Sequence, residues 1–342
     1  YKIYFNKFNK PKLNNIMLDP IPQIIAIQNV GLFCVGQNKT SAIINGDIAE
    51  TSIKTIGSLE KRSSFYGISM KDIFDVEYWS LEQAKLKKQL DPMNGKVTVI
   101  TGGMGTIGLA VAKKFREKGS EVILLDINTN QIKNNKLSKN FKLLQCDVTK
   151  RTEFKKALSH ICLEFGGIDY VVSNAGSAVQ NEIAEISDKK LKNSFEINFF
   201  AHQIVASESV KIMKKQNIGG CLLFNISKQS INPGKNFGAY GTSKAALLAL
   251  CRQYALEYGN IGIRSNGINA DRIQSGLLTK AVISGRAKAR SISPNEYLSS
   301  NLLSKQVLAE DVAQAFYNLS TAEKTTAAVL TVDGGNIAAS LR

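Results

Sequence analysis

Cysteine and histidine are scarce in this sequence. The 342 residues include five scattered cysteines, with no CxxC pair, and two histidines, His160 and His202. An odd number of scattered cysteines argues against a disulfide framework and a structural zinc site, and two histidines are too few for a three-histidine metal site. We therefore expect no bound metal and a reducing, cytoplasmic location.

Long apolar runs are also missing. No stretch approaches the ~18 apolar residues of a membrane span, so we expect no membrane association. The chain opens with YKIYFNKFNK, which has neither a signal-peptide pattern nor an initiator methionine and suits a fragment of a longer protein. The formal net charge of +16 comes mostly from lysines spread along the chain without a nucleic-acid-binding motif, so we expect no nucleic-acid partner.

Short β-rich runs alternate with helical patterns from residue 96 onward. Seven runs predict strands: KVTVI, EVILLD, FKLLQCDV, IDYVVSNAG, GCLLFNIS, GIRSNGINA and AAVLTVDGG. Their continuous apolar character is typical of parallel strands buried on both faces. Helical patterns lie between them, as at residues 108–119 and 189–216. The alternation predicts an α/β fold, a doubly wound, Rossmann-type seven-stranded parallel sheet with helices on both faces.

Residues 1–92 have a different pattern. Two strands and two helices are expected there, at residues 23–29, 31–36, 39–61 and 69–89. Proline and glycine punctuate the chain between Asp91 and Gly95. We therefore expect a smaller N-terminal α+β extension over residues 1–92 and the main domain over residues 93–342.

A glycine-rich turn follows the first strand of the main domain. The string TGGMGTIG holds Gly103, Gly105 and Gly108 in the order G-x-G-x-x-G, between a strand and a helix. In that context glycines let the backbone approach a pyrophosphate, and the start of the helix offers free N–H groups. The turn predicts a dinucleotide site with contacts from Gly102, Gly103, Met104, Gly105, Thr106, Ile107 and Gly108.

Asp126 ends the next strand. A carboxylate at this place accepts hydrogen bonds from the adenosine ribose hydroxyls and repels a 2′-phosphate. The next residues, Ile127 and Asn128, supply no cation for such a phosphate. We therefore expect NAD rather than NADP as the cofactor. The alternative is that Asp126 only caps a turn or a helix.

Tyr240 and Lys244 stand four residues apart at the start of an apolar helix. Residues at this spacing share a helix face, so the ammonium can lie near the phenol and favour its ionised form. Tyr240 could then take a proton from a substrate hydroxyl while hydride leaves the adjoining carbon. The alternative is an exposed surface pair.

These motifs do not stand alone. TGGMGTIG, CDVT, SNAG, Ser227, the Tyr240/Lys244 pair and VDGG follow one another in an order that resembles the short-chain dehydrogenase/reductase family over residues 93–342. The resemblance implies that Ser227 holds the substrate oxygen and that Asn198, in FEINFF, holds a water in a proton relay. It also implies that Lys244 grips the ribose.

The same resemblance implies contacts on the adenosine side, from Asp147, Val148, Asn174, Ala175 and Gly176. Taken singly, Ser227 also suits a strand-end cap, Asn198 a polar helix position and Asp147 a turn.

Two departures from the family pattern are visible. The middle glycine of the family's T-G-x-x-x-G-x-G falls on Thr106, which can still cap the helix start. After the sixth strand, Ala270 and Asp271 stand where the family has Pro-Gly. Backbone of that loop meets the nicotinamide carboxamide in the family, which makes Ile273 an expected contact.

The front segment resembles the tail of a class II aldolase/adducin-like module in fused aldolase–dehydrogenase proteins. The strings MLDPIPQIIAIQNVGLFCVGQNKTSA, DVEYWSLEQAKL, SKQSINPGKNFGAY and TVDGGNIAASLR carry this likeness. Such fusions are associated with sugar breakdown, in particular rhamnulose phosphate cleavage followed by lactaldehyde oxidation. An aldolase of this class needs a histidine zinc site, and residues 1–92 hold no histidine, so we expect no aldolase activity from them.

Together these features predict an NAD-dependent oxidoreductase for a small sugar, polyol or hydroxyaldehyde. The alternative is a catalytically silent dinucleotide-binding scaffold or redox sensor of a fused aldolase. Residues 271–306 are expected to form a lid over the substrate, with five cations of which one or two would meet an anionic group: Arg272, Lys280, Arg286, Lys288 and Arg290. The family resemblance and the apolar AALLALCRQYALEY also lead us to expect a homo-oligomer, a dimer or tetramer.

Overall fold

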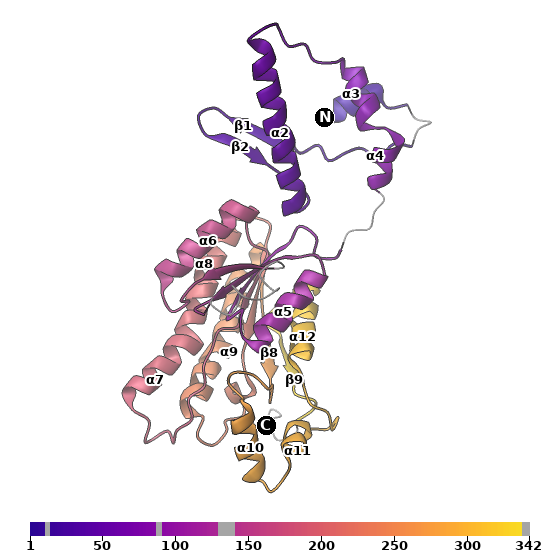
Figure 1. The fold of residues 1–342 in the computed structure, drawn as a ribbon. Helices are drawn as coiled ribbons and strands as arrows, with labels where there is room; N and C mark the ends of the chain where they lie inside the picture. The colour runs from indigo at the N-terminus through magenta and orange to yellow at the C-terminus, as the bar shows by residue number, and fades with distance from the viewer. Residues whose placement is uncertain (11–13, 87–90, 129–140, 337–342) are drawn as a thin grey trace. The chain divides into compact units, whose positions relative to one another are not determined.

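Seven parallel strands form the central sheet of residues 96–342, in the order β5-β4-β3-β6-β7-β8-β9 (Figure 1). They are β3 (Val97–Thr101), β4 (Glu121–Asp126), β5 (Lys142–Gln145), β6 (Tyr170–Ser173), β7 (Gly220–Asn225), β8 (Ile263–Ala270) and β9 (Val329–Val332). The structure, a computed structural model, describes residues 1–10, 14–86, 91–128 and 141–336. Each predicted strand is present, and the predicted fold class is confirmed.

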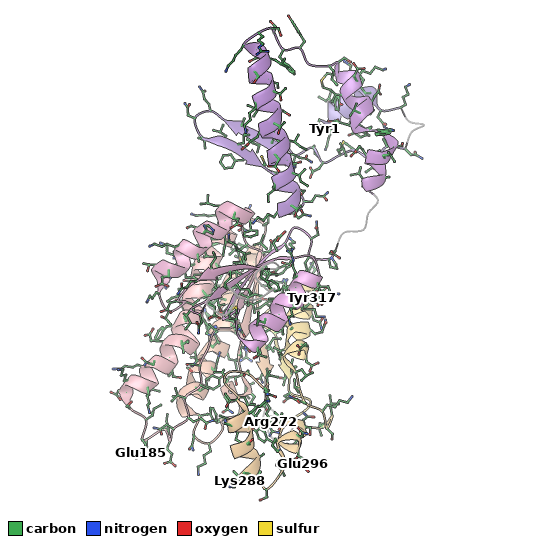
Figure 2. All side chains as sticks on the ribbon, in the orientation of Figure 1. Tyr1, Glu185, Arg272, Lys288, Glu296 and Tyr317 are labelled. Atoms are coloured by element: carbon green, nitrogen blue, oxygen red, sulfur yellow. The ribbon has the colours of Figure 1, made fainter. Side chains whose placement is uncertain are left out.

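Helices that connect successive parallel strands cover both faces of the sheet. On one side lie α5 (Thr106–Glu117) and α12 (Ala309–Thr321), and on the other α6 (Arg151–Phe165), α8 (Ala201–Gln216) and α9 (Gly238–Tyr258) (Figure 1). All five residues of β3 are buried, which is the burial that a parallel sheet requires. Side chains fill the space between the layers (Figure 2).

The predicted helix over residues 189–216 is interrupted in the structure. It consists of α7 (Asp188–Phe195), one π-helical turn η3 (Glu196–Phe200) and α8. A π turn inserts an extra residue into the helix and is found most often at functional sites. Here it contains Asn198, whose side chain is fully buried.

The segment after β8 carries two short helices, α10 (Lys280–Lys288) and α11 (Pro294–Ser299). They pack on each other through a small apolar cluster of their own, which includes Leu278, Ile283 and Tyr297. Ser293 and Glu296 form a reciprocal capping box at the start of α11. The segment therefore packs as a small helical unit of its own, and it follows the carboxyl end of β8.

Residues 1–95 form a separate compact unit. It contains an antiparallel hairpin, β1 (Ile24–Ile27) with β2 (Gly31–Cys34), and the helices α1 (Lys2–Phe8), α2 (Lys39–Glu60), α3 (Met70–Glu77) and α4 (Ser80–Lys85). The predicted hairpin and the predicted helix over residues 39–61 are confirmed. A reciprocal capping box between Asn38 and Ser41 starts α2.

The prediction of one helix over residues 69–89 is wrong. The chain leaves the helical conformation at Trp79, between α3 and α4, and residues 87–89 lie outside the described part. Tyr78 stacks on Phe74 with ring centroids 4.3 Å apart, and its hydroxyl accepts from the amide of Leu18. Both contacts of Tyr78 are tertiary, and tertiary packing can override local helix propensity. The helix α1 was not predicted from the sequence. In the described part of the chain, every helix is too short or too polar to cross a bilayer.

The turn between β3 and α5 depends on two glycines. Gly102 has a φ of +59°, which a side chain disfavours. At Gly108 an added Cβ would lie 2.3 Å from the carbonyl oxygen of Gly102, so the helix start and the strand end touch through bare backbone. At Gly105, by contrast, the added Cβ would meet that oxygen at 3.4 Å, which is an ordinary contact.

Gly108→Ala is therefore expected to lower the free energy of unfolding by about 3 kcal/mol, the upper part of the range for overpacking. The matched control Gly105→Ala should lose at most about 1 kcal/mol, because alanine is only a poorer N-cap than glycine. Urea unfolding followed by far-UV circular dichroism compares the two. Equal losses would contradict this account of the turn.

Candidate active site

A large pocket opens at the carboxyl ends of β3 and β6, where the strand order reverses. In open α/β sheets this switch point is the usual ligand crevice. The pocket lining includes ten of the residues singled out from the sequence: Gly102, Gly105, Thr106, Ile107, Asp126, Asp147, Val148, Asn174, Ala175 and Gly176. These residues come from four different strand ends, and the fold brings them together around one cavity.

Asn174 ties these strand ends together. Its Nδ2 donates to the carbonyl oxygens of Thr101 and Gly102, each at 3.1 Å. Its Oδ1 accepts from Nδ2 of Asn225, at the end of β7, at 2.8 Å. Its own amide donates to the Thr101 hydroxyl at 2.9 Å. The mouth of the pocket is therefore fixed by one amide side chain that bonds to both neighbouring strands.

Asp126 lies at the rim of the pocket with its carboxylate held in place. Oδ2 accepts from the amide of Met104, and Oδ1 from the amide of Asn128, both at 3.0 Å. The carboxylate therefore links the end of β4 to the glycine turn while it lines the cavity. A carboxylate with this placement suits recognition of ribose hydroxyls.

Asp147 and Val148 follow β5 on the far side of the pocket. Asp147 Oδ1 accepts from the hydroxyl of Thr149 at 2.6 Å and from its amide at 3.0 Å. Desolvation opposes the charge of Asp147, but the two Thr149 bonds and the nearby Lys150 outweigh it, and the pKa of Asp147 is lowered. Val148 is buried and offers an apolar wall.

Three of the predicted cofactor residues, Gly103, Met104 and Gly108, shape the turn and do not line the pocket. At Gly103 an added Cβ would lie 2.7 Å from Cβ of Leu124, so this glycine permits close packing on β4. The expectation that Thr106 caps α5 is wrong. Gly105 occupies the N-cap position without a side-chain cap, and Thr106 is the first helical residue.

A second pocket adjoins the first and contains Ser227, Tyr240 and Ile273. Four residues line both pockets: Ile107, Asn225, Ser275 and Leu277. Ser227 is extended, with a φ of 179°, and begins a short 3₁₀ turn by accepting from the amide of Gln229 at 3.2 Å. Ser227 therefore both caps this turn and lines the second pocket.

Tyr240 and Ser227 line the same pocket. Burial raises the pKa of the Tyr240 phenol, and a hydrogen bond with Ser227 opposes part of that rise. The net direction differs from the expectation that a neighbouring ammonium makes this phenol more acidic. The reason is that loss of water around the phenolate outweighs the favourable contacts that the protein itself provides.

Lys244 lies behind the pockets, one helical turn past Tyr240. Its side chain is buried, its Nζ donates to the carbonyl oxygen of Asn225 at 2.8 Å, and it lies 5.9 Å from the centroid of the Tyr240 ring. Burial lowers the pKa of Lys244 to about 7. The exposed-pair alternative for Tyr240 and Lys244 is therefore wrong: Lys244 is buried, and Tyr240 is half-buried in the lining of the second pocket.

Asn198 lines neither pocket, and its side chain is fully engaged. Nδ2 donates to the carbonyl oxygens of Ser177 and Ser194 at 2.8 and 3.0 Å, and Oδ1 accepts from the amide of Ser177 at 3.1 Å. An added Cβ on Gly176 would lie 3.0 Å from Oδ1 of Asn198 and 3.8 Å from Nζ of Lys244. Asn198 therefore fixes the chain beside Gly176, next to the lysine.

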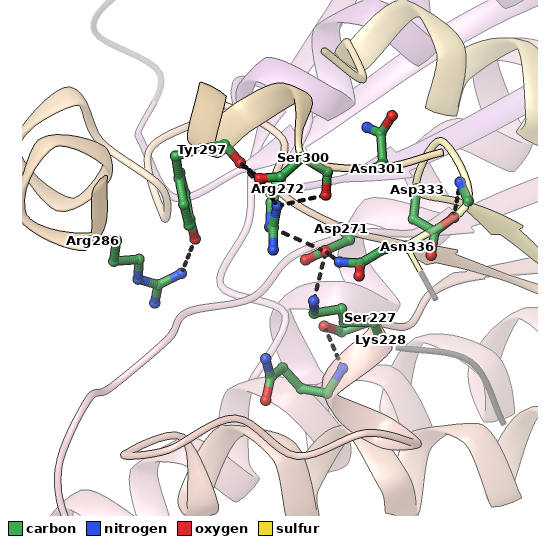
Figure 3. Close-up of polar contacts among 12 residues, drawn as sticks. Ser227, Lys228, Asp271, Arg272, Arg286, Tyr297, Ser300, Asn301, Asp333 and Asn336 are labelled. Carbon is green, nitrogen blue, oxygen red and sulfur yellow. Dashed lines mark hydrogen bonds and ion pairs between the residues drawn. The ribbon is translucent and has the colours of Figure 1, made fainter. Parts of the chain in front are cut away.

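The sequence did not point to Asn225 or Phe237. It also did not show that Asp271 would contact several other side chains. Asn225 stands two residues before Ser227 at the end of a strand, and that position is the signal that could have revealed it. Asp271 accepts from Nζ of Lys228 at 2.7 Å and from Nδ2 of Asn336 at 2.8 Å, and lies 3.6 Å from Nε of Arg272 (Figure 3). No local pattern connects these partners.

The lining of the larger pocket fits a dinucleotide. The glycine turn leaves backbone uncovered, Asp126 and Asp147 line the pocket at the ends of the neighbouring strands β4 and β5, and apolar side chains such as Ile107 and Val148 line it as well. Among the described residues, no cluster of three histidine, cysteine or acidic side chains is placed to hold a metal ion.

Comparisons with known proteins agree with this geometry. A family model described as short chain dehydrogenase matches residues 96–283, and one described as aldolase class II, second domain, matches residues 1–86. The uncharacterized oxidoreductase YuxG of Bacillus subtilis is 32% identical over the whole chain, which spans 52% of that protein's length. The (+)-borneol dehydrogenase 1 of Salvia officinalis is 28% identical over 71% of this chain and 94% of its own.

Solved structures share the fold. The aldohexose dehydrogenase of Thermoplasma acidophilum is 26% identical, covers 72% of this chain and 96% of its own, and superposes with a TM-score of 0.63. A short-chain type dehydrogenase/reductase from Mycobacterium marinum, 24% identical over 72% of this chain and 96% of its own, has a TM-score of 0.64. With the motifs, the sheet order and the pockets in place, these matches show that the chain belongs to the short-chain dehydrogenase/reductase family of oxidoreductases.

Proposed function

We propose that this protein is an NAD-dependent oxidoreductase that moves hydride between NAD and a small sugar, polyol or hydroxyaldehyde. The observation that carries the proposal is the pairing of Tyr240 with Ser227 in a pocket that shares lining residues with the dinucleotide pocket. A proton acceptor and an orienting hydroxyl at that junction are the groups that oxidation of an alcohol requires.

In this reaction Ser227 positions the substrate hydroxyl against Tyr240. As the C–H bond breaks, Tyr240 takes the hydroxyl proton, and the carbon–oxygen bond becomes a carbonyl. Bound nicotinamide dinucleotide supplies the hydride acceptor and a positive charge that favours the phenolate. Lys244 is anchored on Asn225 close to Gly176, where it can hold the ribose, and Asn198 keeps that backbone in place for proton relay.

The choice of NAD rests on Asp126. Its carboxylate faces the pocket and is fixed by two backbone amides, so it cannot turn away from a 2′-phosphate without breaking both bonds. The likeness to an aldohexose dehydrogenase, together with the aldolase match over residues 1–86, supports a carbohydrate substrate and a role in sugar catabolism.

We also propose that residues 1–92 and 93–342 are separate domains, the first a remnant or docking piece of a fused class II aldolase. Two compact units and two family matches support this.

A cytoplasmic location suits the free cysteines Cys34, Cys146, Cys162, Cys221 and Cys251. A homo-oligomer formed through α8 and α9 would cover Leu256, which is 79% exposed.

A silent scaffold or redox sensor is the second candidate function. The feature in its favour is the match to an aldolase domain, which such a module would serve. Tight NAD binding with no NADH formation, across a panel of sugars, polyols and hydroxyaldehydes, would favour it.

Tyr240→Phe is expected to lower kcat/KM for the best substrate of that panel by about 100- to 10,000-fold, the usual contribution of a positioned acid–base group. The matched control is Tyr258→Phe, at the other end of α9, where Tyr258 stacks on Tyr254. The assay follows NADH absorbance, and NAD affinity is measured separately and should stay unchanged in both variants. Near-full turnover by Tyr240→Phe would refute the assignment.

The wild-type protein is expected to prefer NAD to NADP in kcat/KM. Asp126→Asn keeps one amide-accepting oxygen but removes the charge, and should reduce the preference roughly tenfold or more, the worth of a charged hydrogen bond. Glu121→Gln, at the other end of the same strand, is the control and should leave the preference intact. A wild-type preference for NADP would overturn the cofactor assignment.

Lys244 predicts a pH dependence of stability. Its folded-state pKa of about 7 lies below the ordinary 10.5, so between these values the unfolded chain binds more protons, and stability rises with pH. The buried cysteines, whose pKa values are raised from 9.0 to about 11, act in the opposite direction only as the pH nears 9, so they offset just part of this rise. The free energy of unfolding of the cofactor-free protein should therefore rise from pH 7 to pH 9.

Lys244→Met should remove that rise, and Lys113→Met, which changes an exposed lysine on α5, should keep it. Urea unfolding at three pH values within the window measures both. An unchanged slope in Lys244→Met would show that another group produces the rise.

A further inference from the structure

Arg286 reaches the substrate pocket from α10. It lines the same pocket as Tyr240 and Ser227 and is half-buried. Its guanidinium lies 4.7 Å from the centroid of the Phe237 ring, and its Nη1 donates to the hydroxyl of Tyr297 at 3.1 Å (Figure 3). Two aromatic residues therefore hold the guanidinium plane, while its remaining N–H donors stay available.

The other cations of this segment are occupied or lie elsewhere. Arg272 donates from Nη1 to the carbonyl oxygens of Tyr297 and Ser300 and also pairs with Asp271. Arg290 donates to the carbonyl oxygen of Arg286 and lies over the Tyr297 ring, away from the pocket. Lys280 and Lys288 are exposed and do not line this pocket.

No carboxylate neutralises Arg286 among the residues that the structure describes. The nearest acidic group in the pocket lining is Asp271, and it is already paired with Lys228 and Arg272. Together with Arg286, these side chains form a group with three positive charges and one negative charge: Lys228, Arg272, Arg286 and Asp271. The side chains of Lys228 and Asp271 are only 16% and 11% exposed, so water screens this excess weakly.

We propose that Arg286 binds an oxyanion, a carboxylate or a phosphate monoester, carried by the substrate whose hydroxyl meets Tyr240. The inference rests on the proposed function and names the substrate class of the same site. Arginine offers a planar fork of donors that matches both anions, and a guanidinium held by ring contacts loses little freedom on binding them.

The position of Phe237 sets the length of such a substrate. The Phe237 ring neighbours both groups: its centroid is 4.7 Å from the Arg286 guanidinium and 6.3 Å from the centroid of the Tyr240 ring. The cavity volume is about 130 Å³, and the cavity shares four lining residues with the larger pocket. A short hydroxy acid or a small phosphorylated polyol fits these dimensions, with its charged end at Arg286 and its reacting carbon at Tyr240.

The test compares wild type, Arg286→Met and the matched control Arg290→Met. Two substrate pairs separate the possible anions: a short 3-hydroxy acid against its amide, and a polyol phosphate against the free polyol. Arg286→Met should lower kcat/KM for the charged member of the preferred pair by roughly ten- to a hundredfold, through KM, and leave the neutral member within about twofold. Arg290→Met should leave both members unchanged, and Arg286→Lys should restore part of the loss.

A second measurement does not depend on turnover. Malonate and inorganic phosphate, added to the NAD-bound protein, should raise the melting temperature of wild type and Arg290→Met but not of Arg286→Met. If the anions act in this way and no compound is oxidised, the proposed oxidoreductase function fails and the anion site stands. If neutral substrates are oxidised as well as charged ones and Arg286→Met changes neither, the proposed function stands and the anion site is refuted.

Discussion

The hydrogen bonds of Asn174 are the constraint on which the rest of this site depends. One half-buried amide joins the ends of β3 and β6 and, through Asn225, the end of β7. The glycine turn begins at the end of β3. Asn225, at the end of β7, supplies the carbonyl oxygen that accepts from Nζ of Lys244. The backbone of the glycine turn and the ammonium of Lys244 are thus both tied to strand ends that the Asn174 side chain connects.

Burial acts on the two titrating groups in opposite directions. It raises the pKa of Tyr240 and lowers that of Lys244 to about 7, so both groups favour their neutral forms in the protein alone. Loss of solvent penalises a charge of either sign. The protein alone therefore disfavours the ionised phenol, and a positive charge bound beside it would favour that form.

The sequence predicted the sheet and most of the dinucleotide pocket because both depend on short, local patterns. Apolar runs mark buried strands, and the glycines, Asp126 and Asn174 each stand at a strand end that their own neighbours define. Asn225, Phe237 and the partners of Asp271 could not be found in this way, since Lys228, Asp271 and Asn336 are far apart along the chain. The break at Trp79 and the direction of the Tyr240 pKa shift depend equally on tertiary surroundings.

Asp271 has a wider consequence. The carboxylate that replaces the expected Pro-Gly pair joins three separate segments: the loop that carries Ser227, the base of the segment with α10 and α11, and the stretch after β9 (Figure 3). All three contacts are made to the same oxygen, Oδ2, so a displacement of any one segment acts on that atom. A shift of the segment with α10 and α11 is therefore expected to move the loop that carries Ser227 as well, because both are bonded to this one carboxylate.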